Sequence, residues 1–409
     1  MAEHLYTMTI DLNVLDHLGI NLYSNVAAVL TEAVANAWDA DAAEVRITFD
    51  VDGDAILIQD DGAGMSVQDM NDKYLRVGYR RREEESPITP KGRVVMGRKG
   101  LGKLSLFSIA DTVAVQSCKE GERHGLRMSA SKIREAMKDR LSEYHPEGLK
   151  DEEVTVEKGT AILLAALKRG RLGLTGAALR RRLARRFSVI GSTQFRVYLD
   201  GDEVTARDRG DLGVVQFLWD IGEGTDHSEF CPDMKEHEVV PGAMDGRPED
   251  WAIRGWIGTA GKPKQLETSS GNLNSIVVLA RGRLLLENVL DRINDGRLYT
   301  KYLTGQIEAD FLDKDDLDDI VTSDRQRVLE NDERYEALIA FLRTTLNHVE
   351  SGWSEWRRKH GAEQVIQENP ILIEWLNSLP EGVRKHARDV LAKVGAAPVE
   401  RMSRTGRSC

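Results

Sequence analysis

The chain has 409 residues, of which 41% are hydrophobic and 30% charged, and these are ordinary values for a globular protein. Its net charge of −11 argues against a surface coated with basic residues for nucleic acid, but it leaves room for one basic groove. Three widely spaced cysteines argue against a disulfide framework or a zinc site and favour a reducing cytoplasm, and no apolar run is long enough to predict a membrane partner.

The first motif is residues 30–41, LTEAVANAWDAD. Apolar residues recur at helical spacing here, which predicts a helix with one buried face. Glu32, Asn36 and Asp39 share another face of this helix. The Glu32 carboxylate is placed to accept a proton from water, and the Asn36 amide oxygen suits Mg²⁺. A merely solvated polar stripe on a half-buried helix explains the same pattern equally well.

Two strands are predicted next, at residues 44–50 and 54–59, with an Asp-Gly pair between them that indicates a hairpin. The second strand runs into D-x-G-x-G. Asp60 is suited to accept a hydrogen bond from the exocyclic amino group of a purine, and Gly62 and Gly64 allow close approach of the ring. The alternative is a plain Asp-Gly turn.

Residues 76–98 are polar and irregular, which predicts a loop: either a functional lid or a disordered insertion. The segment 97–105, GRKGLGKLS, follows it and leads into an apolar helix. Backbone N–H groups and lysines in such a segment bind phosphate. It is not the P-loop pattern, because only two residues separate Gly97 from Gly100.

Further elements of the first half alternate between strand and helix. The patterns predict a helix at residues 131–144 and strands at 112–117, 154–167 (two segments meeting at a Gly-Thr pair) and 195–200. The hydroxyl of Thr160 is suited to bond to a base or to Asp60, although threonine is also simply a good strand residue.

Four motifs in order carry a family resemblance: E-x-x-x-N-A-x-D-A, D-x-G-x-G, G-x-x-G-x-G and G-T, all between Glu32 and Thr160. This order resembles the GHKL ATPase superfamily of gyrase B, the heat-shock ninety chaperones, histidine kinases and MutL. The resemblance implies an α+β chain with a Bergerat fold, a two-layer α/β sandwich in which ATP lies between the helices and a lid. The segment GRKGLGKLSLF and the long lid look most like MORC-type and bacterial heat-shock-like ATPases.

The resemblance also implies roles for single residues, with ATP and Mg²⁺ as cofactors. Glu32 is then the general base, Asn36 the Mg²⁺ ligand and Asp60 the adenine partner, while Lys103 stabilises charge during catalysis. The residues implied to contact the nucleotide are Asn36, Asp60, Gly62, Gly64, Met65, Arg98, Lys99, Gly100, Leu101, Gly102, Lys103 and Thr160.

Composition divides the chain into four parts. We expect an ATP-binding domain at 1–207 with its lid at about 76–103, a transducer-like αβ domain at 208–347, a helical segment at 348–400 and a tail at 401–409. Residues 208–245 are polar and rich in Gly and Asp, which indicates a boundary. Strands are predicted at 251–259, 275–280 and 305–311, with a helix at 330–349, and two Pro residues then divide the helical segment into short helices.

The second domain contains an Arg281-Gly282-Arg283 turn, which resembles the N-G-R turn of MutL-like and gyrase-like proteins. In many relatives this domain lends a basic residue to the γ-phosphate. Our choice for that residue is Arg325, then Arg327. The alternative is that both only cap or decorate a loop.

Two charge runs have plain explanations. The basic stretch 179–187 is suited to nucleic-acid phosphates, but we favour a solvated helix face or pairing with acidic residues elsewhere. The acidic run 313–319 lacks the glycine and terminal glutamate of a calcium loop, so we expect a solvated loop or a helix start.

We therefore predict an Mg-dependent, ATP-hydrolysing conformational switch that forms a homodimer on ATP. Its client is DNA or a partner effector, in bacterial antiviral defence or DNA repair. The alternatives are a chaperone-like ATPase and a nucleotide-binding module that does not hydrolyse. A histidine kinase is disfavoured, because only His4 and His17 precede the first motif.

Overall fold

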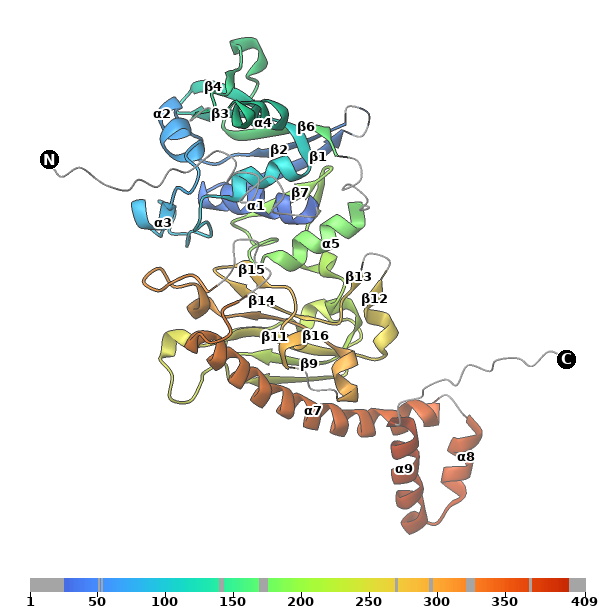
Figure 1. The fold of residues 1–409 in the computed structure, drawn as a ribbon. Helices are drawn as coiled ribbons and strands as arrows, with labels where there is room; N and C mark the ends of the chain where they lie inside the picture. Colours follow the sequence, from blue (N-terminus) through green and yellow to red (C-terminus); the bar gives the residue numbers. More distant parts are fainter. Residues whose placement is uncertain are drawn as a thin grey trace.

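The chain folds into two stacked lobes and a helical arm (Figure 1). The computed structural model describes residues 26–50, 52, 54–139, 143–168, 176–268, 271–293, 297–320, 328–367 and 370–396. Helices and strands alternate throughout, which confirms the predicted α+β class. The predicted tail at 401–409 lies outside the described residues.

The first lobe is built on a sheet of eight strands in the order β5-β4-β3-β6-β2-β1-β7-β8. Neighbouring strands are antiparallel except β1 and β7. The strands are β1 (Glu44–Asp50), β2 (Ala55–Asp60), β3 (Ala110–Lys119), β4 (Glu122–Ser129), β5 (Glu147–Gly148), β6 (Gly159–Leu167), β7 (Arg196–Leu199) and β8 (Asp202–Val204). Such a mixed, mainly antiparallel sheet is what the Bergerat fold implies.

Helices cover one face of this sheet. The helices of the lobe are α1 (Val26–Asp39), α2 (Val67–Asp69), α3 (Arg81–Glu84), α4 (Ala130–Lys138) and α5 (Gly176–Arg186). Leu30 and Val34 of α1 and Leu183 of α5 belong to the same buried core as Ile47 of β1 and Ile56 of β2. The apolar face of α1 is therefore fixed against the sheet, and its polar face turns the other way.

Two local predictions in this lobe need correction, and one strand was not predicted. The helix predicted at 131–144 ends at Lys138, and the stretch 154–167 holds one strand that starts at Gly159 rather than two. Strand β4 was not predicted, because its sequence ERHGLRMS lacks a clear alternation of apolar and polar residues.

The second lobe has a sheet of six strands in the order β10-β9-β11-β16-β14-β15. These are β9 (Val215–Ile221), β10 (Glu236–Val240), β11 (Arg254–Ala260), β14 (Ile276–Ala280), β15 (Arg283–Leu286) and β16 (Leu303–Glu308), with a small pair β12 (Glu267–Thr268) and β13 (Gly271–Asn272) and a short helix α6 (Leu290–Ile293) beside it. Strands β9 and β10 lie inside the polar stretch 208–245, so that stretch contributes to the sheet and is not only a boundary.

The C-terminal arm consists of α7 (Glu333–Gln367), α8 (Pro370–Ser378) and α9 (Glu381–Ala396), and Figure 1 shows α8 and α9 projecting from the body. Helix α7 is longer than the predicted helix at 330–349. Trp356 stacks on Trp219 of β9 with ring centroids 4.5 Å apart, and such aromatic contacts extend the buried face of α7 beyond Val349. The breaks before α8 and α9 fall at prolines, as predicted.

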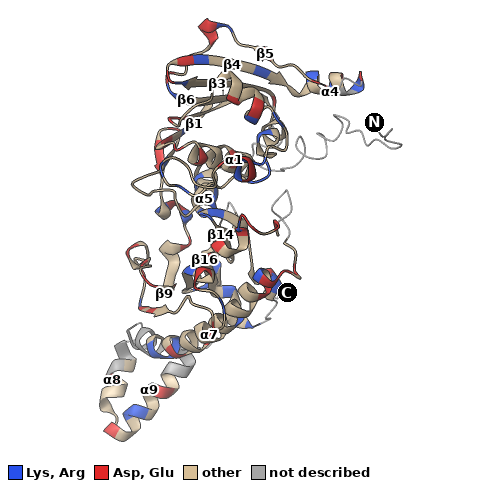
Figure 2. Ribbon diagram, turned by 90° about the vertical axis from the view of Figure 1, so that its left-hand side faces the viewer, with Lys and Arg blue, Asp and Glu red and all other residues tan. Residues whose placement is uncertain are grey.

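Charged residues of both signs are spread over both lobes (Figure 2), in keeping with the modest net charge. Cys118 and Cys231 are buried free thiols. Among the described helices, none combines the length and the apolar character that crossing a bilayer requires.

Candidate nucleotide site

A cavity of about 480 Å³ lies between α1, the end of β2, the glycine-rich segment and the second lobe. Residues predicted to contact a nucleotide line it together, although they come from four separate stretches of the chain. They are Asn36, Asp60, Gly64, Met65, Arg98, Lys99, Gly100, Leu101, Gly102, Lys103 and Thr160, and Glu32 lines the same cavity. Gly62 does not line it, but a Cβ there would lie 2.7 Å from the carbonyl oxygen of Ala40, so this position has no room for a side chain.

One end of the cavity is formed by Asp60 and Thr160, which face each other on the paired strands β2 and β6. The carboxylate of Asp60 accepts a hydrogen bond of 2.9 Å from the N–H of Gly62. Burial raises the pKa of Asp60 to about 6, although backbone hydrogen bonds from Gly62 and Thr160 oppose this shift. The Asp60 carboxylate is therefore a buried hydrogen-bond acceptor whose position is fixed by main-chain hydrogen bonds.

The loop after Asp60 requires glycine. Gly64 has φ of +68°, and a Cβ there would lie only 2.1 Å from the carbonyl oxygen of Cys118. The next residue, Met65, donates its N–H to the Ser117 hydroxyl at 2.8 Å. This loop therefore packs directly against β3, and it does not cover the part of the cavity next to Asp60.

Helix α1 supplies the opposite wall. Glu32 is half-buried and Asn36 is exposed toward the cavity, while Asp39 on the same side is fully buried. Asp39 accepts from the N–H groups of Met96 and Gly97 at 2.7 and 2.8 Å, and burial raises its pKa. No role is predicted for Asp39 from the first motif, but this residue anchors the start of the glycine-rich segment.

The glycine-rich segment passes close to α1 and then enters a 3-10 helix, Gly102–Ser108. A Cβ at Gly102 would lie 2.4 Å from a carboxylate oxygen of Glu32, so a larger residue here would require the Glu32 side chain to shift. Lys103 donates to the carbonyl oxygens of Lys73 and Arg76 at 3.2 and 2.5 Å, and burial lowers its pKa to about 8. Its ammonium group is therefore tied to the first lobe in this structure.

The second lobe reaches the same cavity through Arg283, the first residue of β15, which donates a hydrogen bond to Glu32. The side chains of Arg283 and Glu32 are only 3% and 12% exposed. The Arg281-Gly282-Arg283 turn marks this residue in the sequence, but the predicted γ-phosphate contact is Arg325, then Arg327. Both of these lie outside the described residues, so their role stays a prediction.

A larger cavity of about 910 Å³ lies beside α5 and holds none of the predicted site residues. Two of its arginines have acidic partners: Arg185 contacts the Asp211 carboxylate at 3.3 Å and donates to the Ser275 hydroxyl at 2.8 Å, and Arg186 pairs with Glu287. The expectation that the basic stretch pairs with acidic residues holds for these two. We therefore take the smaller cavity as the candidate site.

The architecture and the cavity define a class of protein. Residues 23–160 match the family model described as "Histidine kinase-, DNA gyrase B-, and HSP90-like ATPase". This match supports the GHKL resemblance that the four motifs indicate, and the first lobe carries a domain of the kind that binds ATP.

Particular relatives extend this similarity. A "Putative type II restriction enzyme HgiDII" from Herpetosiphon aurantiacus is 38% identical over 371 residues, which is 90% of this chain and 59% of that protein. "Chaperone protein HtpG" from Anaplasma marginale and from Nocardia farcinica are 31% and 30% identical over 27% of this chain and 21% of each chaperone. The chain thus spans about three fifths of the restriction-enzyme relative and about a fifth of the chaperones. The likeness to MORC-type proteins stays a prediction.

Proposed function

We propose that this chain is an Mg-dependent, ATP-hydrolysing conformational switch. The observation that carries the proposal is the pairing of Glu32 with Arg283, because it joins the candidate base to a cation from the other lobe. A nucleotide that enters this cavity must act on both partners, so its phosphates are coupled to the relative placement of the lobes.

In this proposal Glu32 takes the proton of the attacking water, and Arg283 supplies positive charge to the γ-phosphate. While no nucleotide is bound, Arg283 neutralises Glu32. When a γ-phosphate attracts Arg283, the carboxylate is released to act as a base. Lys103, Arg98 and Lys99 bind the phosphates from the lid, and Asp60 with Thr160 binds the adenine. Arg325 stays a further candidate for the γ-phosphate contact.

Asn36 fits the role of magnesium ligand. Its side-chain amide lines the cavity one turn after Glu32 and has no hydrogen-bond partner among the described residues. Mg²⁺ takes oxygen ligands and is commonly held by one or two protein groups together with substrate phosphates. A bound magnesium ion supplies charge neutralisation for those phosphates.

We extend the proposal to a homodimer that forms on ATP and acts on DNA, in defence or repair. The support is the relative that covers 90% of this chain and is named a putative restriction enzyme. A chaperone-like role has less support, because the chaperone matches cover only 27% of the chain. The buried free thiols Cys118 and Cys231 suit the reducing cytoplasm in which the proposal sets the protein.

The decisive experiment measures ATP hydrolysis and oligomeric mass together, for the wild type, Glu32→Ala and Glu32→Gln, with and without duplex DNA. The alanine variant leaves the buried guanidinium of Arg283 unpaired, whereas the glutamine variant keeps an acceptor for it. We expect both to retain ATP binding and to lose at least about 100-fold in turnover, since a general base contributes about 10²–10⁴-fold.

Glu122→Ala is the matched control, because Glu122 is an exposed glutamate at the start of β4, outside the cavity. It should hydrolyse ATP like the wild type. A dimer trapped by ATP in Glu32→Gln, with hydrolysis stimulated by DNA in the wild type, would support the full proposal. Ordinary turnover in both Glu32 variants would remove this residue from the role of base, and a wild type that binds ATP without hydrolysing it would favour the binding module.

A further inference from the structure

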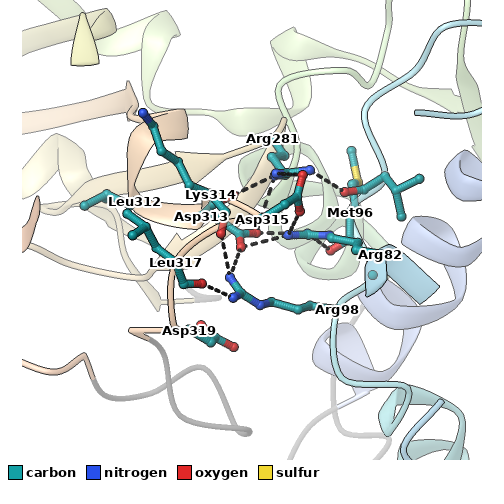
Figure 3. Close-up of polar contacts among 12 residues, drawn as sticks. Arg82, Met96, Arg98, Arg281, Leu312, Asp313, Lys314, Asp315, Leu317 and Asp319 are labelled. Atoms are coloured by element: carbon teal, nitrogen blue, oxygen red, sulfur yellow. Dashed lines mark hydrogen bonds and ion pairs between the residues drawn. The ribbon is translucent and has the colours of Figure 1, made fainter. Parts of the chain in front are cut away.

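The acidic run at residues 313–319 of the second lobe contacts the lid of the first lobe (Figure 3). The carboxylate of Asp313 receives both terminal nitrogens of Arg82, at 2.8 and 2.9 Å, and one nitrogen of Arg98 at 3.0 Å. Arg98 also donates to the backbone carbonyls of Lys314 and Leu317. Residues 315–318 are exposed, as the predicted solvated loop implies, but Asp313 and Asp319 are not solvated: they meet cations of the lid.

A second contact of the same kind is made by Lys99, the residue after Arg98. The ammonium group of Lys99 is 3.0 Å from a carboxylate oxygen of Asp319. Within the second lobe, Arg281 holds the run in shape: it lies 2.6 Å from the Asp315 carboxylate and donates to the carbonyl of Asp313 at 2.8 Å. Asp313 and Asp315 thus lie in a braced segment, and Asp315 also meets the lid, 3.5 Å from Arg82.

The basic partners in these contacts are the residues proposed to bind phosphate. Arg98 and Lys99 belong to the glycine-rich segment, and Asp313 and Asp319 line the same cavity as Asn36. A carboxylate and a phosphate offer a guanidinium the same paired acceptors, so one can replace the other at Arg98. The Asp313 side chain is only 12% exposed, so water competes weakly with this exchange.

We propose that the segment 313–319 is an internal phosphate surrogate. The carboxylates of Asp313 and Asp319 bind Arg98 and Lys99 until the phosphates of ATP take the place of these carboxylates. The inference rests on the proposed function, because it requires ATP in this cavity. Each ion pair given up on binding lowers the apparent ATP affinity, and in return Arg98 and Lys99 lose their contacts with the second lobe, while Arg82, which does not line the cavity, keeps its pair with Asp313. Together with the transfer of Arg283 away from Glu32, this exchange connects nucleotide binding to lobe movement.

The test compares Asp319→Asn with Asp316→Asn by titration calorimetry of the full chain with Mg²⁺ and a non-hydrolysable ATP analogue. Both substitutions are isosteric and remove one negative charge from the same run, but Asp316 is exposed and does not line the cavity. We expect Asp319→Asn to bind the analogue about fivefold more tightly, a change at the lower end of typical couplings between sites. Asp316→Asn should bind it like the wild type.

A double-mutant cycle assigns the effect to Lys99. Lys99→Gln should weaken analogue binding, and Asp319→Asn added to it should change the affinity no further, because the competing pair no longer exists. Hydrogen exchange gives a second measurement: in the wild type, amide exchange of residues 313–320 should rise when the analogue is added.

The outcomes separate this inference from the proposed function. If the wild type binds no ATP analogue, both are overturned. If it binds while Asp319→Asn leaves the affinity unchanged and exchange of residues 313–320 does not respond, only the surrogate is overturned. Weaker binding by Asp319→Asn would also overturn it, because the carboxylate would then assist the nucleotide rather than compete with it.

Discussion

The two ends of the cavity are built in different ways. The end that holds Asp60 is made within the first lobe by the pairing of β2 with β6 and of β6 with β3. The other end combines α1, the glycine-rich segment and the second lobe, and its charged groups pair across the lobes, as Glu32 does with Arg283 and Lys99 with Asp319.

We call the end that holds Asp60 the rigid end and the end that holds Glu32 and Arg283 the switching end. The rigid end is suited to recognise the nucleotide, and the switching end is suited to respond to it. Where main-chain hydrogen bonds fix a polar group, its position is set before a ligand arrives, and little reorganisation is needed on binding. Where charges satisfy each other, a ligand of matching charge must exchange partners, and the exchange moves whatever carries those partners. We therefore expect substitutions at the first end to act on ATP affinity alone, and substitutions at the second end to act also on turnover or on lobe movement.

The largest effect is expected from Gly64→Ala, which breaks the rigid end. A Cβ at this position would lie 2.1 Å from the Cys118 carbonyl oxygen, and its φ of +68° disfavours any other residue. The backbone strain and the clash together should lower the free energy of unfolding by about 3 kcal/mol, and the displaced loop should abolish measurable ATP binding. Thermal unfolding and calorimetry check both effects.

Gly201→Ala is the control for Gly64→Ala. Gly201 also has positive φ, of +88°, but no atom lies within 4 Å of its added Cβ, and it is remote in sequence from the cavity segments. It should cost only about 1 kcal/mol and leave ATP binding intact. Equal losses in the two variants would show that backbone strain, rather than the fit against β3, matters at Gly64.

The next effect is expected from Arg283→Gln, at the switching end. Because Arg283 is proposed to stabilise charge on the γ-phosphate during hydrolysis, turnover should fall by about 100-fold, as it does when one charge-stabilising donor is removed from other enzymes. ATP affinity should change much less. Steady-state hydrolysis and calorimetry measure the two quantities separately.

Arg254→Gln serves as the control for this variant, since Arg254 is an exposed arginine on β11 of the same lobe and does not line the cavity. Faster hydrolysis by Arg283→Gln would contradict the proposal in an informative way. It would mean that Arg283 only locks Glu32 and contributes nothing to the reaction.

The two ends also differed in how far the sequence predicted them. Asp60, Gly64 and Thr160 stand in local motifs that predict them as site residues, and they line the cavity together. The alternation of EVRITFD predicts β1 at residues 44–50, as the structure has it. In that part of the site each residue lies in or beside a strand of the first lobe, although Asp60 and Thr160 are 100 positions apart. Local pattern is then enough, because the register of paired strands follows from their alternation.

The switching end could not be predicted in the same way. Arg283 pairs with a residue 251 positions away and Arg82 with one 231 positions away, and no periodicity connects them. The acidic run was interpreted as solvated because its own sequence has no partner for its charges. Strands β9 and β10 were missed for a related reason: polar and glycine-rich neighbours hide them, and their burial comes from α7 and from the rest of the sheet.

The smallest effect concerns pH at the rigid end, where Asp60 has a pKa of about 6, raised by burial from its ordinary value of 3.8. An amino group of adenine donates best to the ionised carboxylate, so ATP affinity should fall by about tenfold from pH 7 to pH 5. Stability should move the other way: the folded state binds this proton more tightly than the unfolded chain, so Asp60 makes the free energy of unfolding fall as pH rises from about 4 to about 6.

Asp60→Asn isolates this contribution, because protonation of ATP itself affects both proteins equally. The variant should bind ATP more weakly at pH 7 and lose the part of the pH dependence that the wild type shows between pH 5 and 7. Calorimetric titrations of both proteins across this range make the comparison. Parallel pH profiles would mean that Asp60 does not meet the adenine amino group, and the nucleotide would then have to lie in the cavity in another orientation.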